Sequence, residues 1–121
     1  MTKEEEIEVC ETVNEHPDVV KNLKDEMLSD EEFTRLGNLY KIFSDPMRIK
    51  IIFALFENEM CVCDLSAALG ATQSNVSHHL AILKANDLVT YKKQGKEVIY
   101  RLSDDHVKKI FAMGLEHIRE K

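Results

Sequence analysis

The chain has 121 residues, of which 44% are hydrophobic and 31% are charged. This size and composition predict a single soluble domain, or one domain with a tail, and exclude a disordered or collagen-like protein. No apolar run approaches the about 20 residues of a membrane span, so we expect no membrane partner. The acidic N-terminus lacks the pattern of a signal peptide, which favours a cytoplasmic protein. Its three cysteines are then expected to be free thiols or metal ligands.

The net charge of −6 is unevenly distributed along the chain. Residues 1–32 contain 3 Lys and 12 Asp or Glu, a balance of −9, whereas residues 33–121 contain 13 Lys or Arg and 10 Asp or Glu, a balance of +3. Within residues 72–103 there are 5 basic residues and 2 acidic ones. This asymmetry indicates a modest basic patch, which suits nucleic acid but equally suits a solvated face.

The N-terminal part of the chain is predicted to be an acidic arm, residues 1–30, with one helix at about 17–28. Apolar residues at helical spacing then predict a helix over about 31–43. After it, Asp45 is expected to cap a new helix, and Pro46 to occupy its first position, where no N–H donor is needed.

Two short helices separated by a turn are predicted at about residues 64–85. Gly70 can adopt the positive φ that ends the first helix, and Thr72 is expected to cap the second. This arrangement is typical of a helix-turn-helix, although many helical hairpins share it.

A β-hairpin and a final helix follow. Alternating apolar residues on both sides of Gly95 predict the hairpin at 89–102, and apolar residues at helical spacing predict a dimer helix at 105–120. A hairpin directly after a recognition helix is typical of a wing. The fold class predicted for residues 31–121 is therefore mostly α with a small β-hairpin wing. This is a winged helix-turn-helix, and a homodimer would enlarge the small core of one chain.

Several segments, in the same order, resemble the ArsR/SmtB family of metal-responsive winged-helix repressors. They are residues 43–48 (Phe-Ser-Asp-Pro-Met-Arg), 61–65 (Cys-Val-Cys-Asp-Leu), 74–80 (Ser-Asn-Val-Ser-His-His-Leu), the wing 92–96 and the C-terminal Asp-x-His…His-x-x-Glu. The resemblance covers about residues 33–121 and includes the zinc and cadmium sensors of the family. It implies a dimer that binds operator DNA and leaves it when metal binds.

Four residues near the C-terminus match the family's zinc site between subunits: Asp104, His106, His117 and Glu120. Along one helix the two histidines lie about 16 Å apart, too far to share an ion whose ligand bonds are about 2 Å long. In an antiparallel helix pair, facing residues have a nearly constant sum of numbers, and here the histidines add up to 223 and the acids to 224. The pattern predicts two Zn²⁺ sites per dimer, each shared by both chains. The alternative is a solvated helix that carries these residues incidentally.

Cys61 and Cys63 precede the first helix of the helix-turn-helix, where two thiolates can share a soft ion. In the family this position is a thiol-rich sensor site for cadmium, lead or arsenic. The arm contributes only Cys10, where cadmium-sensing relatives carry a pair, so another side chain or water would complete the site. Two alternatives stay open: Asp64 is a ligand or a helix N-cap, and Cys61 is a ligand or a small buried apolar residue.

The start of the recognition helix is predicted to read double-stranded operator DNA, an A·T-rich inverted repeat, because Asn pairs with adenine and hydroxyls bind bases or phosphates. The residues expected on its exposed face are Ser74, Asn75, Ser77 and His78. For His78 and His79 we favour DNA contact or packing over metal binding, and we expect one to pack inward because adjacent helical residues diverge by about 100°. Three wing lysines are expected to contact the DNA backbone without reading sequence: Lys92, Lys93 and Lys96.

The sequence thus predicts a metal-sensing transcriptional repressor. Its apo dimer binds an operator and is released by Zn²⁺, with Cd²⁺ or Pb²⁺ as alternatives, so that a metal efflux or sequestration gene is expressed. One alternative is a sensor of cadmium, lead, arsenite or oxidation that acts through Cys61 and Cys63. Another is a metal buffer without an operator, which the basic wing disfavours. No enzyme is expected, because no catalytic cleft pattern is present and four protein ligands leave zinc no open position.

Overall fold

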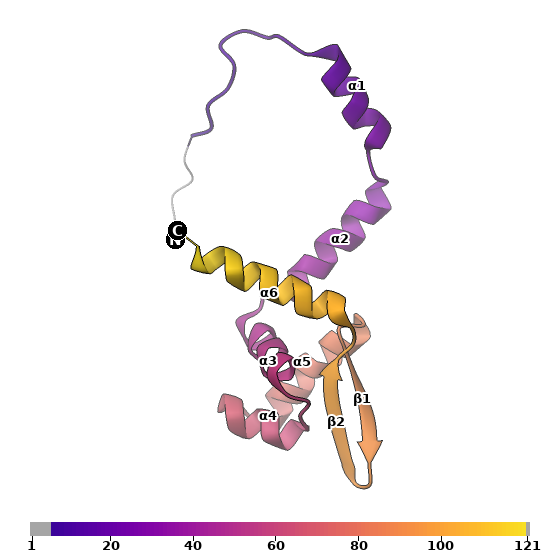
Figure 1. The fold of residues 1–121 in the computed structure, drawn as a ribbon, viewed down its shortest axis with the longest axis vertical. Coiled ribbons are helices and arrows are strands. Elements are labelled where there is room, and N and C mark those ends of the chain that lie inside the picture. The colour runs from indigo at the N-terminus through magenta and orange to yellow at the C-terminus, as the bar shows by residue number, and fades with distance from the viewer. Residues whose placement is uncertain (1–5, 121) are drawn as a thin grey trace. The chain divides into compact units, whose positions relative to one another are not determined.

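The computed structural model describes residues 6–120, which form six helices and one two-stranded antiparallel sheet (Figure 1). The chain divides into two compact units, one ending at Phe33 and the other beginning at Thr34. None of the described helices is long and apolar enough to cross a membrane. The assignment of residues 1–30 as an arm and of 31–121 as the DNA-binding and dimerisation domain stays a prediction.

The first unit contains α1 (Pro17–Glu26) and the start of α2 (Asp30–Ile42). The helix α1 begins at Pro17, as predicted, but ends two residues before the predicted 28, and none of its residues is buried. At the start of α2, the Ser29 hydroxyl accepts a hydrogen bond from the Glu32 N–H at 3.1 Å. The Glu32 carboxylate accepts one from the Ser29 N–H at 3.4 Å. This reciprocal pair is a capping box, which satisfies two free donors of the helix end.

The second unit contains the end of α2 and the elements of the predicted winged helix-turn-helix. They are α3 (Pro46–Glu57), α4 (Val62–Leu69), α5 (Gln73–Ala85), β1 (Val89–Gln94), β2 (Glu97–Leu102) and α6 (Asp105–Arg119). Helices α3, α4 and α5 pack around one core, and the β1–β2 hairpin projects from them (Figure 1). The fold class is thus a winged helix-turn-helix.

Polar caps define where these helices begin. Asp45 caps α3 by accepting hydrogen bonds from the N–H groups of Met47 and Arg48 at 2.8 and 3.1 Å. Thr72 caps α5 through the Asn75 N–H at 3.0 Å, as predicted. Helix α4 ends at Gly70, whose φ of 64° is the left-handed conformation that favours glycine.

The start of α4 differs from the prediction. The helix begins at Val62 rather than at residue 64, and Cys61 occupies the N-cap position in extended conformation. Asp64 therefore lies within the first turn, so its interpretation as the N-cap is wrong. An acidic side chain in a first turn is still favourable, because the helix N-terminus carries partial positive charge.

Apolar side chains from every element of the second unit meet in the core. The three most deeply buried side chains of α5 are Val76, Leu80 and Leu83, all at most 2% exposed, and they pack against Ile51, Ile52 and Leu55 of α3. Complete burial of such a side chain stabilises the fold by about 1.5–3 kcal/mol. Helix α5 is thus held by its apolar side, and its opposite side is exposed.

The hairpin is anchored at its base and free at its tip. Its strands pair from Val89 opposite Leu102 to Gln94 opposite Glu97. At the base, Met60 exchanges two backbone hydrogen bonds with Tyr100, at 2.8 and 3.1 Å. These bonds fix the base of the hairpin to the connection between α3 and α4, and the tip projects away from the helices (Figure 1).

Replacing Asp45 with alanine is expected to destabilise the fold at neutral pH and not under acid. The hydrogen bond from the Arg48 N–H is the main cause that lowers the pKa of the Asp45 carboxyl from its usual 3.8, against an opposing effect of burial. Because the pKa is lower in the folded chain, this stabilisation is complete above about pH 4 and is lost as pH falls through the folded pKa. We expect the thermal midpoint of Asp45→Ala to be about 5 °C lower at pH 7.

Urea and thermal unfolding at pH 7 and near pH 2 measure this effect. Asp45→Asn is the matched control, because asparagine also caps a helix but does not titrate. The stability of Asp45→Asn at pH 7 is expected to stay close to that of the wild type, and this variant should lose less stability in acid than the wild type does. Equal acid sensitivity of the asparagine variant and the wild type would assign the effect to another group.

Candidate DNA-reading face and metal ligands

Helix α5 presents a polar face to solvent. The four residues predicted to read DNA are all exposed on it: Ser74, Asn75, Ser77 and His78. The residues buried on the opposite side are Val76, His79, Leu80 and Leu83. The arrangement offers hydroxyl, amide and imidazole groups on a helix that can enter a major groove.

The β1–β2 hairpin carries basic side chains on its exposed part. Lys92, Lys93 and Lys96 are all exposed, and Lys96 lies in the hairpin turn next to Gly95, whose φ is 63°. The Lys92 ammonium lies 3.4 Å from the carboxylate of Glu59. At the junction with α5, the Lys84 ammonium stacks 5.0 Å from the ring centre of Tyr91. Exposed cations on a projecting hairpin suit contacts with phosphate groups.

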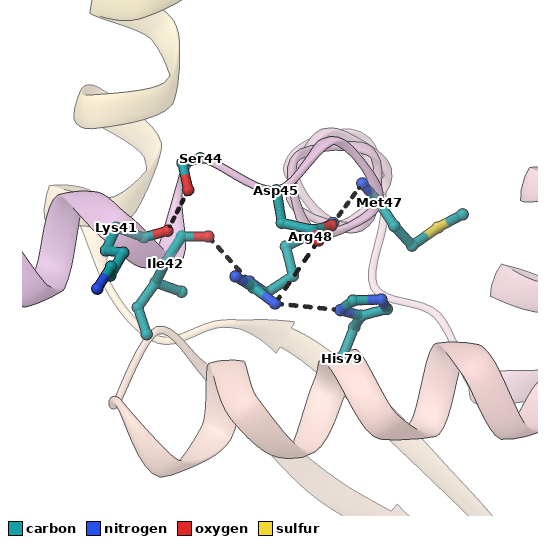
Figure 2. A network of polar contacts seen from close by, with 7 residues as sticks. All are labelled: Lys41, Ile42, Ser44, Asp45, Met47, Arg48 and His79. Carbon is teal, nitrogen blue, oxygen red and sulfur yellow. Dashed lines mark hydrogen bonds and ion pairs between the residues drawn. The ribbon is translucent and has the colours of Figure 1, made fainter.

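His79 is the histidine that packs inward. It is 9% exposed, whereas His78 is exposed, and the two rings lie 5.2 Å apart edge to face. Nδ1 of His79 lies 3.3 Å from Nη1 of Arg48, and Nε of Arg48 donates a hydrogen bond to the Ile42 carbonyl at 2.9 Å (Figure 2). The sequence pattern predicts no role for Arg48 beyond its place in the family segment 43–48. Its side chain comes from another helix, so helical periodicity alone could not reveal this contact.

Asp104 and His106 are brought together at the start of α6. One carboxylate oxygen of Asp104 caps the helix, accepting from the N–H groups of His106 and Val107 at 2.9 and 3.3 Å. The other oxygen lies 3.6 Å from Nδ1 of His106, and the side chains are 53% and 87% exposed. The cap thus orients the carboxylate and leaves one oxygen available beside an open imidazole.

His117 and Glu120 lie at the other end of α6, and both are exposed. The 15 residues of this helix span about 22 Å at 1.5 Å per residue. Within the described part of the chain, no three His, Cys, Asp or Glu side chains gather closely enough to hold a metal ion. The shared site between two subunits stays a prediction.

The face of α6 that carries His117 is largely apolar. Met113 is 65% exposed and Ile118 is 77% exposed, while Val107 near the start of the helix is buried. Met113 and Ile118, together with Tyr40 and Phe43 of the α2 region, border a groove in which His117 also lies. An apolar surface of this kind on one chain is typical of a surface that another protein covers.

The thiols are positioned around the start of α4. Cys61 is half-buried and Cys63 is exposed, and Nε2 of Gln73 donates to the sulfur of Cys63 at 3.6 Å. Gln73 is the first residue of α5, so the thiol is in contact with the recognition helix. Cys10 is exposed in the first unit. A soft-metal site formed by these cysteines stays a prediction.

The chain is similar to known regulators over nearly its whole length. Residues 45–91 match the family described as "Bacterial regulatory protein, arsR family". The chain is 34% identical to the transcriptional repressor SmtB homolog of Synechocystis, over 96% of this chain and 88% of that protein. The chain belongs to the ArsR/SmtB family.

Two further comparisons agree with this assignment to the ArsR/SmtB family. The cadmium resistance transcriptional regulatory protein CadC homolog of Staphylococcus aureus is 35% identical, over 99% of this chain and 96% of that protein. The solved structure of HlyU from Vibrio cholerae aligns with a TM-score of 0.68 and 29% identity, over 76% of this chain and all of that one. The predicted resemblance to metal-responsive winged-helix transcriptional repressors is therefore confirmed, and the SmtB and CadC homologs are described as transcriptional regulators.

Proposed function

We propose that this ArsR/SmtB-family protein binds operator DNA as an apo homodimer and is released by Zn²⁺, with Cd²⁺ and Pb²⁺ as alternatives. The observation that carries the proposal is the free polar face of α5, held from behind by the core and lying beside a hairpin with exposed lysines. A metal buffer needs neither feature. Release would allow expression of a gene for metal efflux or sequestration.

DNA readout is proposed to divide between α5 and the wing. Asn75 and the two serines 74 and 77 supply donors and acceptors for base edges, and His78 lies one turn further along the exposed face. Lys93 and Lys96, with Lys92 once it leaves Glu59, contact phosphates and position the domain. Two copies related by a two-fold axis require an inverted repeat.

Dimerisation is proposed to use the apolar face of α6. Met113 and Ile118 would become buried against the same face of a second copy, and a two-fold axis makes this contact self-complementary. An antiparallel pair of α6 helices places the Asp104–His106 end of one chain beside the His117–Glu120 end of the other. The dimer is therefore the assembly that would complete the metal ligands.

The residues present fit a zinc ion. Two imidazoles and two carboxylates are ligands that tetrahedral Zn²⁺ accepts, and Asp104 is already oriented beside His106 by its cap hydrogen bonds. When bound, zinc would supply a cross-link between the two α6 helices. The protein's own part is to hold the ligand side chains of both chains at one place, which changes the relative position of the two recognition helices. By linkage, operator DNA must weaken zinc binding by the same factor.

Selection from a random duplex pool tests this function. We expect the apo protein to enrich an inverted repeat whose half-sites lie about one helical turn apart. Zn²⁺, Cd²⁺ and Pb²⁺ are then titrated against the labelled selected duplex, followed by fluorescence anisotropy. Failure to enrich any sequence would contradict the repressor function, and operator binding that no metal weakens would contradict metal release.

The wing lysines are expected to contribute affinity without specificity. Replacement of Lys93 and Lys96 by alanine removes two phosphate contacts from each protomer and four from the dimer. The slope of log affinity against log salt should therefore become less steep by about 3.5. Affinity should decrease similarly for the operator and for a scrambled duplex. Lys108→Ala on α6, outside the hairpin, is the control, and a selective loss of operator binding would contradict the backbone role.

A thiol sensor is the second candidate. The contact between Gln73 and Cys63 favours it, because an ion or oxidant at the thiol would act directly on the first residue of the recognition helix. Release by Cd²⁺, arsenite or peroxide that disappears in the variant Cys61→Ser/Cys63→Ser, and persists in His117→Ala, supports this function over the zinc switch.

A further inference from the structure

Arg48 is a bridge between three helices of the second unit. Its side chain is 15% exposed, and Nε donates to the carbonyl of Ile42, the last residue of α2, at 2.9 Å. Nη1 lies 3.3 Å from Nδ1 of His79 on α5 and 4.0 Å from the carboxylate of Asp45 at the start of α3 (Figure 2). One planar group thus connects the end of α2, the start of α3 and the recognition helix.

The contact with Arg48 defines the chemical form of His79. A guanidinium has five N–H donors and no acceptor, so Nδ1 of His79 must accept the hydrogen bond. This hydrogen bond requires a neutral imidazole with its proton on Nε2. If Nδ1 carried the proton, two donors would face each other and no hydrogen bond could form.

This bond constrains α5 in a way that its apolar contacts do not. Burial of Val76, Leu80 and Leu83 is non-directional, so it tolerates small rotations of the helix about its axis. A hydrogen bond to His79 depends on angle and weakens steeply when misaligned. His79 directly follows His78 on the exposed face, so a rotation that breaks the bond also moves His78 and Asn75 relative to the bases.

We propose that Arg48 is a positioning residue for operator readout, which fixes the rotation of α5 through neutral His79. The inference rests on the proposed function, since it assumes that the exposed face of α5 reads base edges. It assigns no DNA contact to Arg48 itself. Loss of the bond should reduce specific binding and leave sequence-independent binding unchanged, because phosphate contacts from the wing do not depend on the angle of α5.

The test uses the full-length chain and duplexes with the selected operator or a scrambled sequence. Arg48→Met and His79→Leu are each expected to weaken operator binding about tenfold, as the loss of one good base contact does. Binding to the scrambled duplex and its salt slope should stay at the wild-type value. His79→Asn, whose side-chain oxygen takes the place of Nδ1, should restore operator affinity to within about threefold.

A double variant separates a positioning role from two independent packing defects. Because the two side chains act through one bond, Arg48→Met/His79→Leu is expected to be no weaker than either single variant. Additive losses, or equal losses on the operator and the scrambled duplex, would overturn the proposal. Circular dichroism and sedimentation of each variant check the fold and the oligomeric state.

Nitrogen NMR of the wild type tests the proposal without any variant and without DNA. We expect the 15N shifts of His79 at pH 7 to show a neutral ring protonated at Nε2. A ring protonated at Nδ1, or charged, overturns the inference even when operator binding is intact. If the wild type instead selects no operator, the proposed function fails, and a neutral His79 with its proton on Nε2 would still support the Arg48 bond as a fixed link between α3 and α5.

Discussion

Zn²⁺ is expected to weaken operator binding by the wild type about 10- to 100-fold and to leave His117→Ala bound. The size follows from typical coupling free energies of about 1–3 kcal/mol between two sites on one protein. His117 is an exposed imidazole at the end of α6 opposite the Asp104–His106 pair. Removing it leaves each proposed site with three protein ligands, which is too few to hold the two helices rigidly together.

The measurement is anisotropy of the labelled operator during titration with Zn²⁺, with competition by a chromophoric chelator for stoichiometry. Glu120→Ala should also stay bound, whereas Glu116→Ala, which changes an exposed acid on the same helix, should be released like the wild type. Two ions per dimer are expected for the wild type. If zinc releases His117→Ala from the operator while Cys61→Ser/Cys63→Ser stays bound to it, the thiols and not the α6 ligands form the regulatory site.

Met113→Glu is expected to convert the dimer into a monomer and to reduce operator affinity at least about 100-fold. Met113 is 65% exposed on one chain and borders the apolar groove that contains His117. A carboxylate buried there by dimerisation costs several kcal/mol unless it is paired. A monomer binds one half-site only and loses the avidity that comes from joining two DNA-binding domains.

Sedimentation velocity and anisotropy measure the two effects on the same samples. Lys108→Ala on the same helix changes the net charge by the same −1, and it should remain dimeric with normal affinity. Binding of Met113→Glu to a duplex with a single half-site should equal that of the wild type, because α5 is untouched. A dimeric Met113→Glu would show that another surface forms the interface.

Much of the fold follows from local sequence. Asp45, Thr72 and Gly70 mark helix ends as expected, because caps and left-handed residues depend only on neighbouring backbone groups. The hairpin register follows from alternation on both sides of Gly95. The start of α4 was predicted two residues too late, because Cys61 holds the N-cap position without a side-chain hydrogen bond that a sequence pattern could reveal.

The candidate site was predictable as a set of residues and not as a set of contacts. The spacing of Asp104, His106, His117 and Glu120 indicates a shared metal site, but the second role of Asp104 as the cap of α6 emerges from its hydrogen bonds. Likewise, two adjacent histidines imply that one packs inward, and only the core identifies it as His79.

The sequence by itself thus determined the family, the order of the elements and the exposed polar face of α5, because periodicity and capping are properties of short segments. The tertiary structure alone decided that Arg48 of α3 contacts His79 of α5, and that Gln73 contacts Cys63. It also decided that the apolar face of α6 stays exposed in one chain. These contacts join residues far apart in the chain, and their geometry depends on how whole helices pack against a common core.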